Sequence, residues 1–93
     1  MRRGRLRLIA SPDGADGSVT IHQDARVYAG LFDGAERTSC RLAKGRKGYI
    51  HVVRGKVTVN GHELGAGDAL KTDAAEITLE RGEAAEVLLF DLP

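Results

Sequence analysis

The sequence predicts an all-β protein, a sandwich or barrel built from about ten short strands. Apolar and polar residues alternate over several short segments, as they do in half-buried strands. Turn residues separate these segments about every 6 to 12 positions, and no stretch has a convincing helical period. The chain of 93 residues has room for one domain, and its 12 glycines suit a fold with many turns.

Five strands are expected in the first part of the chain. Val19–Gln23 alternates apolar and polar residues, and Ala25–Leu31 places Val27, Ala29 and Leu31 on the face opposite Tyr28. The segment Ser11–Gly17 is punctuated by Pro and Gly and is too short to join two domains, so we expect a loop. The expected strands are Leu6–Ala10, Val19–Gln23, Ala25–Leu31, Thr38–Leu42 and Lys47–Arg54.

The second part of the chain contains the clearest local signal. Asn60-Gly61 lies between two short β segments, and this pair tolerates the positive φ that a type I′ hairpin needs. Further turns are expected at Gly65–Asp68 and Arg81–Glu83. Val87–Phe90 is a continuous apolar run, typical of a strand buried on both faces. The expected strands are Val57–Val59, His62–Leu64, Ala69–Lys71, Glu76–Glu80 and Val87–Phe90.

Composition excludes several classes of protein. Hydrophobic residues make up 42% and charged residues 29%, an ordinary balance for a soluble globular domain. The longest apolar runs are about four residues, whereas a membrane-spanning helix needs about 20. No signal peptide is visible, so we expect a cytoplasmic protein without membrane association. The single cysteine excludes an internal disulfide and a cysteine-based metal site.

Charge is distributed unevenly although the net charge is only +1. Residues 1–56 carry twelve Lys and Arg against five Asp and Glu, and residues 57–93 carry two against eight. One interpretation is that strands of opposite sign lie side by side and neutralise each other. The alternative is a dipolar surface that docks a partner or a second copy. With four aromatic residues for base stacking, the basic residues do not predict nucleic-acid binding.

Two groups of residues carry a family resemblance. Gly48–Gly61 followed by Gly65-Ala66-Gly67-Asp68 resembles the middle of a cupin domain. Arg5–Gly14, Asp16–Asp24 and the ending Val87–Leu92 are similar to the C-terminal half of pirin-family bicupins, which are also called quercetin 2,3-dioxygenase-like proteins. The resemblance covers nearly the whole chain. It implies a single cupin-type jelly-roll barrel, a double-stranded β-helix, over residues 1–93.

The resemblance also implies where metal ligands would lie. In the cupins that this chain resembles, the metal ligands are two His separated by one residue, then a Glu, then a third His on a later strand. Counted from Gly55, these positions fall near Arg41, Ala43, Gly48 and Glu76, and no His lies between residues 23 and 50. In a pirin-like bicupin the metal belongs to the N-terminal barrel. We therefore expect no metal and no cofactor in this chain.

The remaining chemistry-bearing residues give a weak candidate site. Because Ile50 and Val52 are the better candidates for the interior, His51 is expected to face outward. The simpler interpretation is a surface or interface histidine; the alternative is a polar patch that binds an anion or a partner. His62 follows the hairpin turn and is expected to be solvated, and Cys40 to be a buried small side chain. The candidate patch residues are Tyr49, His51, Arg54, Arg41 and His22.

Three functions remain open from the sequence. The first, which we favour, is a non-catalytic interaction module that forms a homodimer or pairs with a separate metal-bearing cupin. The second is part of a quercetin 2,3-dioxygenase-like oxidoreductase, whose metal ligands this chain lacks. The third is a barrel that binds a small molecule in its interior without chemistry.

Overall fold

The computed structural model describes residues 4–14, 17–20 and 24–93. The described residues form eight strands and no α-helix, so none of these residues belongs to a helix that could cross a membrane. The strands are β1 (Leu6–Ser11), β2 (Val19–Thr20), β3 (Arg26–Phe32), β4 (Thr38–Arg41), β5 (Lys47–Val59), β6 (His62–Gly65), β7 (Ala69–Thr72) and β8 (Glu76–Leu92). The predicted all-β cupin fold is confirmed.

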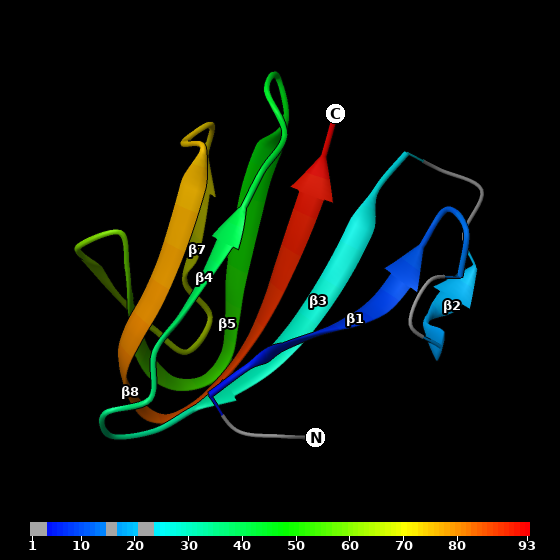
Figure 1. Cartoon of the computed structure of the whole chain (residues 1–93). Coiled ribbons are helices and arrows are strands. Elements are labelled where there is room, and N and C mark those ends of the chain that lie inside the picture. The colour runs from blue at the N-terminus through cyan, green and yellow to red at the C-terminus, as the bar shows by residue number, and fades with distance from the viewer. Residues whose placement is uncertain (1–3, 15–16, 21–23) are drawn as a thin grey trace.

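Two long strands organise the fold. β5 has 13 residues and β8 has 17, and they pair with each other along most of their length. The sheet order is β2-β1-β3-β8-β5-β6, with β4 added to β8 and β7 added to β5. Figure 1 shows that β8 bends sharply, so that its first half lies beside β4 and its second half beside β3. The bends fold one continuous sheet into the two layers of a jelly roll.

The core lies between these layers and is entirely apolar at its centre. Each half of each long strand sends alternate side chains inward, because successive residues of a strand point to opposite faces. Ile50, Val52, Val57 and Val59 of β5 have no solvent exposure, and the inward residues of β8 are equally buried. The inward residues of β8 with no exposure are Ile77, Leu79, Val87 and Leu89.

The hairpin predicted at Asn60-Gly61 is confirmed. Asn60 has φ 48° and Gly61 has φ 83°, and the register pairs Val59 with His62. The Asn60 side chain adds a contact that the sequence did not predict. Its Oδ1 accepts a hydrogen bond from the Thr78 backbone N–H at 2.8 Å, so the turn is tied to β8 as well as closed on itself.

The prediction of about ten short strands was wrong in two places. The expected strands Lys47–Arg54 and Val57–Val59 are one bent strand, β5, and those at Glu76–Glu80 and Val87–Phe90 are one bent strand, β8. The residues Arg81–Glu83, expected to be a turn, lie within β8. Positive φ angles and register shifts bend the long strands while their pairing continues, so a turn signal in the sequence marks a bend here.

The burial predicted for Val87–Phe90 also needs correction. Val87 and Leu89 are fully buried, but Leu88 and Phe90 are only half-buried. The apolar run had indicated a strand covered on both faces. In this chain only the inward face is completely covered, and the other face of the same strand lies at the surface.

Candidate functional site

Three of the five candidate patch residues lie on one side of β5. Tyr49 and His51 alternate with the buried Ile50 and Val52, which confirms that His51 faces outward. Arg54 follows a register shift and lies opposite Glu86, on the same outer side. The structure therefore brings Tyr49, His51 and Arg54 onto one surface, and whether they bind a ligand stays a prediction.

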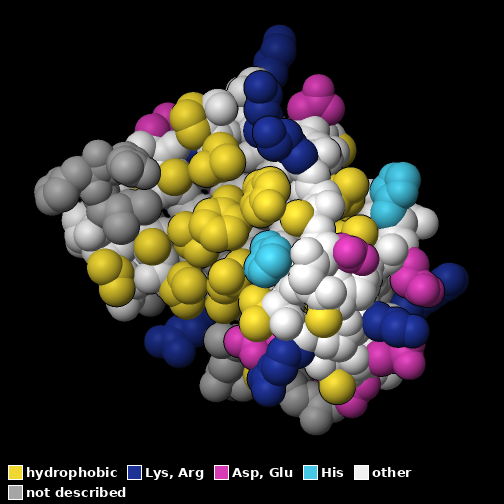
Figure 2. Space-filling view, turned by 180° about the vertical axis from the view of Figure 1, so that it is seen from behind, with side chains coloured by type: hydrophobic (Ala, Val, Ile, Leu, Met, Phe, Trp, Pro, Cys, Tyr) yellow, Lys and Arg dark blue, Asp and Glu magenta, His cyan; other side chains and the backbone are white. Residues whose placement is uncertain are grey.

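That surface continues across the neighbouring strands, and we call it the outer face. Its residues are Val27, Ala29 and Leu31 on β3, Glu86, Leu88 and Phe90 on β8, and Tyr49, His51 and Arg54 on β5. Tyr49 and Phe90 lie opposite each other on β5 and β8. Their ring centroids are 5.9 Å apart, in an edge-to-face arrangement. Figure 2, which shows the molecule from behind, has hydrophobic side chains gathered across one side of the surface.

The outer face is apolar but incompletely covered. Except for buried Ala29 and exposed Arg54, its members are half-buried, whereas the inward side chains of β5 and β8, such as Val52 and Leu89, are fully buried. The predicted faces of β3 are confirmed, since Val27, Ala29 and Leu31 share this side and Tyr28 packs inward against the core. A half-buried apolar surface of this kind is suited to contact with another protein.

The other two candidate residues do not join this group. Arg41 is the last residue of β4 and lies opposite Glu76, the first residue of β8, so it belongs to the other layer. Its Nε lies 3.7 Å from Glu76 Oε2 in an exposed ion pair. His22 lies outside the described residues.

Pairing across strands explains the uneven charge of the sequence. Arg54 Nη2 lies 2.6 Å from Glu86 Oε1, Arg41 contacts Glu76, and the register places Lys56 opposite Glu83. The basic β5 therefore lies beside the acidic β8, which favours the interpretation in which the two halves of the chain neutralise each other. Arg54 and Arg41 are both engaged by carboxylates and are not free anion ligands.

A second ion-pair network was not predicted from the sequence. Arg46 Nε donates to Asp91 Oδ1 at 2.6 Å, its Nη1 lies 3.0 Å from Asp24 Oδ2, and its Nη2 donates to the backbone oxygens of both residues. The hydrogen bond to Asp91 raises the pKa of Arg46 above its ordinary value, although partial burial opposes it. The network ties the loop before β5 to the end of β8. No sequence signal links residues so far apart.

Cys40 lies on the inner side of β4, opposite the buried Ile77, and packs against the core while remaining partly exposed. Burial raises the pKa of the thiol above its ordinary value, and Asp91 adds to the rise. A raised pKa lowers the thiolate fraction, so the site does not favour a reactive cysteine.

The interior does not fit the metal centre of a cupin. At Gly48, where the resemblance places the Glu ligand, a Cβ would lie 2.4 Å from Ile77 Cδ1 and 3.3 Å from Leu42 Cδ1. Apolar side chains occupy the space that a ligand side chain would need. In the part of the chain that the structure describes, no three His, Cys, Asp or Glu side chains gather as a metal site would require.

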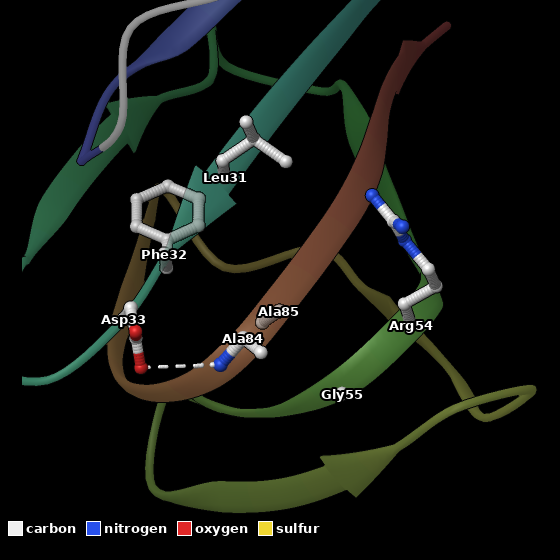
Figure 3. Close-up of a pocket in the computed structure, with 7 residues that line it drawn as sticks. All are labelled: Leu31, Phe32, Asp33, Arg54, Gly55, Ala84 and Ala85. Carbon is white, nitrogen blue, oxygen red and sulfur yellow. Dashed lines mark hydrogen bonds between the residues drawn. The ribbon is translucent and has the colours of Figure 1, made fainter.

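A groove of about 470 Å³ lies at the edge of the outer face, over the bend of β8. Figure 3 shows Leu31 and Phe32 of β3 on one side of β8 and Arg54 of β5 on the other. Ala84 and Ala85 lie between them. Asp33 accepts a hydrogen bond from the Ala84 backbone N–H at 3.2 Å (Figure 3). This groove could not be predicted from the sequence, because its lining comes from β3, the residue that follows it, β5 and β8, which are distant from one another in the chain.

The chain is similar to known proteins over nearly its whole length. A family model described as "Quercetinase C-terminal cupin domain" matches residues 8–92. The chain is 39% identical over 88 residues to a quercetin 2,3-dioxygenase of Escherichia coli (strain K12), covering 94% of this chain and 38% of that protein.

Two solved structures of YhhW from Escherichia coli are similar over the whole of this chain. One superposes with a TM-score of 0.92 at 36% identity, and this chain covers 40% of it. The other, of bacterial pirin YhhW in complex with nickel(II), gives a TM-score of 0.91 at 36% identity with 41% of that chain covered. The chain therefore spans about two fifths of the length of these relatives.

Proposed function

The chain belongs to the pirin family, as a quercetinase C-terminal cupin domain, and we propose that it is a non-catalytic pairing module. Its outer face docks against a second cupin barrel. The observation that carries this proposal is the set of half-buried apolar side chains that cross β3, β8 and β5 on one side of the sheet. Covering such a surface removes apolar area from water, which favours association.

The nature of the partner follows from the length of the relatives. This chain aligns with about two fifths of each, so more than half of their length is outside the match. The pirin resemblance implies that this additional length holds a second, metal-bearing cupin barrel. Where such a barrel is present it occupies the outer face, and where the chain is alone a second copy takes its place.

The described residues support a non-catalytic role over the alternatives. Apolar side chains fill the space at Gly48, where the resemblance places the Glu ligand, and we infer that any quercetin 2,3-dioxygenase-like chemistry belongs to the second barrel. A ligand in the barrel interior is disfavoured because the inner face is filled by fully buried apolar side chains. The outer face is a surface suited to recognition of a second barrel.

The test is the mass of the chain in solution. At micromolar concentration we expect light scattering or sedimentation equilibrium to give about twice the chain mass of 10.0 kDa. Leu88→Glu places a charge at the centre of the outer face and is expected to yield monomer, because the docked surface would have to bury that charge. A clean mass near 10 kDa for the unmodified chain would contradict self-pairing.

The matched control for Leu88→Glu is Ser39→Glu. Ser39 is exposed on β4, in the layer away from the outer face, so the variant adds the same charge without touching the docking surface. We expect Ser39→Glu to remain dimeric. Thermal melts of both variants check that Leu88→Glu is still folded, so that a loss of pairing is not a loss of the barrel. Dissociation of both variants alike would show that the outer face is not the interface.

A further inference from the structure

We propose that the groove over the bend of β8 binds a planar aromatic ring. This goes beyond pairing, because the groove is complete within one chain. Its lining comes from β3 and the residue that follows it, from β5 and from β8, and its volume of about 470 Å³ lies within the usual range for ligand pockets, roughly 300–1,000 Å³. Gly55, Ala84 and Ala85 form the floor of the groove, Leu31 forms an apolar wall, and Arg54 forms a planar cationic wall.

The floor is bare because it is formed by a glycine and two alanines, and the backbone at Gly55 excludes any side chain. Gly55 has φ +71°, and a Cβ at this position would lie 2.2 Å from the Glu83 carbonyl oxygen and 2.4 Å from the Ala84 carbonyl oxygen. Ala84 itself has φ 48°, a conformation that is uncommon for a residue with a side chain. The hydrogen bond that Asp33 accepts from the Ala84 N–H holds this bend. The opening is therefore a fixed part of the fold.

The two walls differ in chemistry. Leu31 presents an apolar side chain from β3, and Phe32 and Ala85 beside it are buried. Arg54 lies on the opposite side of β8 (Figure 3), with 70% of its side chain exposed and one Nη held 2.6 Å from Glu86. A guanidinium is planar and stacks on aromatic faces, and here the ion pair limits its motion.

The charges around the groove disfavour an anionic ligand. The positive charge of Arg54 is already compensated by Glu86, and the carboxylate of Asp33 lies at the other side of the groove. An added anion would approach both carboxylates without finding a free cation. A neutral ring carries no charge for these carboxylates to repel, and Leu31 and Arg54 offer it an apolar contact and a guanidinium contact at the same groove.

Two sources could supply such a ring. It could belong to a free small molecule, or to an aromatic side chain of the barrel that docks on the adjoining outer face, because Leu31 and Arg54 are members of both surfaces. The shared chemistry is the planar ring. Sedimentation in the presence of an added aromatic molecule separates the two sources.

The test is a titration of the ¹⁵N-labelled chain with indole, followed by the backbone amide signals. We expect saturable shifts at Gly55, Ala84 and Ala85, with a dissociation constant in the millimolar range that suits so small a ligand. Acetate is the comparison probe and is expected to leave these amides unshifted. Absence of saturable shifts with indole, or equal shifts with acetate, would overturn the proposal.

A pair of matched variants tests the cationic wall. Arg54→Gln removes both the positive charge and the guanidinium plane, so we expect indole binding to weaken about two- to five-fold, the ratio that a surface cation–π contact supplies. Arg41→Gln makes the same change at an exposed arginine that is also paired with a glutamate across strands, and is expected to leave binding unchanged. Equal affinities for the two variants would remove Arg54 from the site.

Sedimentation with indole present identifies the source of the ring. If saturating indole dissociates the paired chain, the ring belongs to the docked barrel. If pairing is unaffected, the groove binds a free small molecule. Should the chain prove monomeric, pairing fails as a function while the amide shifts still decide whether the groove binds a ring, so the two failures can be distinguished.

Discussion

The second half of β8 presents two apolar faces that differ in how deeply they are buried. On the inner face Val87 and Leu89 have no exposure, and on the outer face Leu88 and Phe90 alternate with them but are half-buried. The residue types are nearly the same, so hydrophobicity does not separate the two faces. What separates them is the layer formed by β4, the first half of β8 and the second half of β5, which covers only the inner side. The outer side is covered by nothing in the described part of the chain.

The largest contrast is expected from truncating one leucine on each face. Leu89→Ala removes a fully buried side chain and leaves a cavity, which should lower the free energy of unfolding by about 2–5 kcal/mol. Leu88→Ala removes a half-buried side chain at the surface and should cost less than about 1 kcal/mol in the monomer. Urea denaturation of both variants, at a concentration where the chain is monomeric, measures the difference. Equal losses would mean that the outer face is packed as tightly as the core.

A smaller contrast is expected from the two carboxylates of the same half-strand. Asp91 lies on the buried side with Arg46, and their side chains are 10% and 14% exposed. Asp91→Asn leaves the guanidinium without its main partner and should cost about 2–3 kcal/mol of unfolding free energy.

The matched variant is Glu86→Gln on the outer face, where the pair with Arg54 is 31% and 70% exposed. We expect a loss below about 1 kcal/mol, because solvent screens an exposed ion pair. The same urea series measures both variants. A cost for Glu86→Gln as large as that for Asp91→Asn would show that the outer ion pair is also shielded from water.

The smallest expected effect is on the rate at which the Cys40 thiol is alkylated. Because burial raises the pKa of the inward Cys40 thiol, its thiolate fraction at pH 8 is below that of an unfolded cysteine. We expect iodoacetamide to alkylate the folded chain several-fold more slowly than the chain in urea, and the rate to keep rising with pH above the ordinary thiol range. Equal rates in the folded and unfolded states would place Cys40 outside the covered layer.

Local patterns were sufficient for part of the fold and for part of the site. The Asn60-Gly61 hairpin follows from two residues that tolerate positive φ, and the outward direction of His51 follows from simple alternation with Ile50 and Val52. The bends of β5 and β8 could not be predicted, because Gly55 and Arg81 have turn-like sequences while their strands remain paired. The partner of Arg46 could not be predicted either, since Asp91 is brought to it by the last strand.

The sequence by itself determined the all-β class, the alternation of each strand and the family, because these depend on neighbours along the chain and on the order of residues. Only the tertiary structure decided which apolar face is covered, which charges neutralise each other and where a groove opens. Each of these depends on the sheet register and on the bends of β5 and β8, which place residues from distant parts of the chain side by side. Burial is a property of that arrangement, and an apolar run such as Val87–Phe90 does not specify it alone.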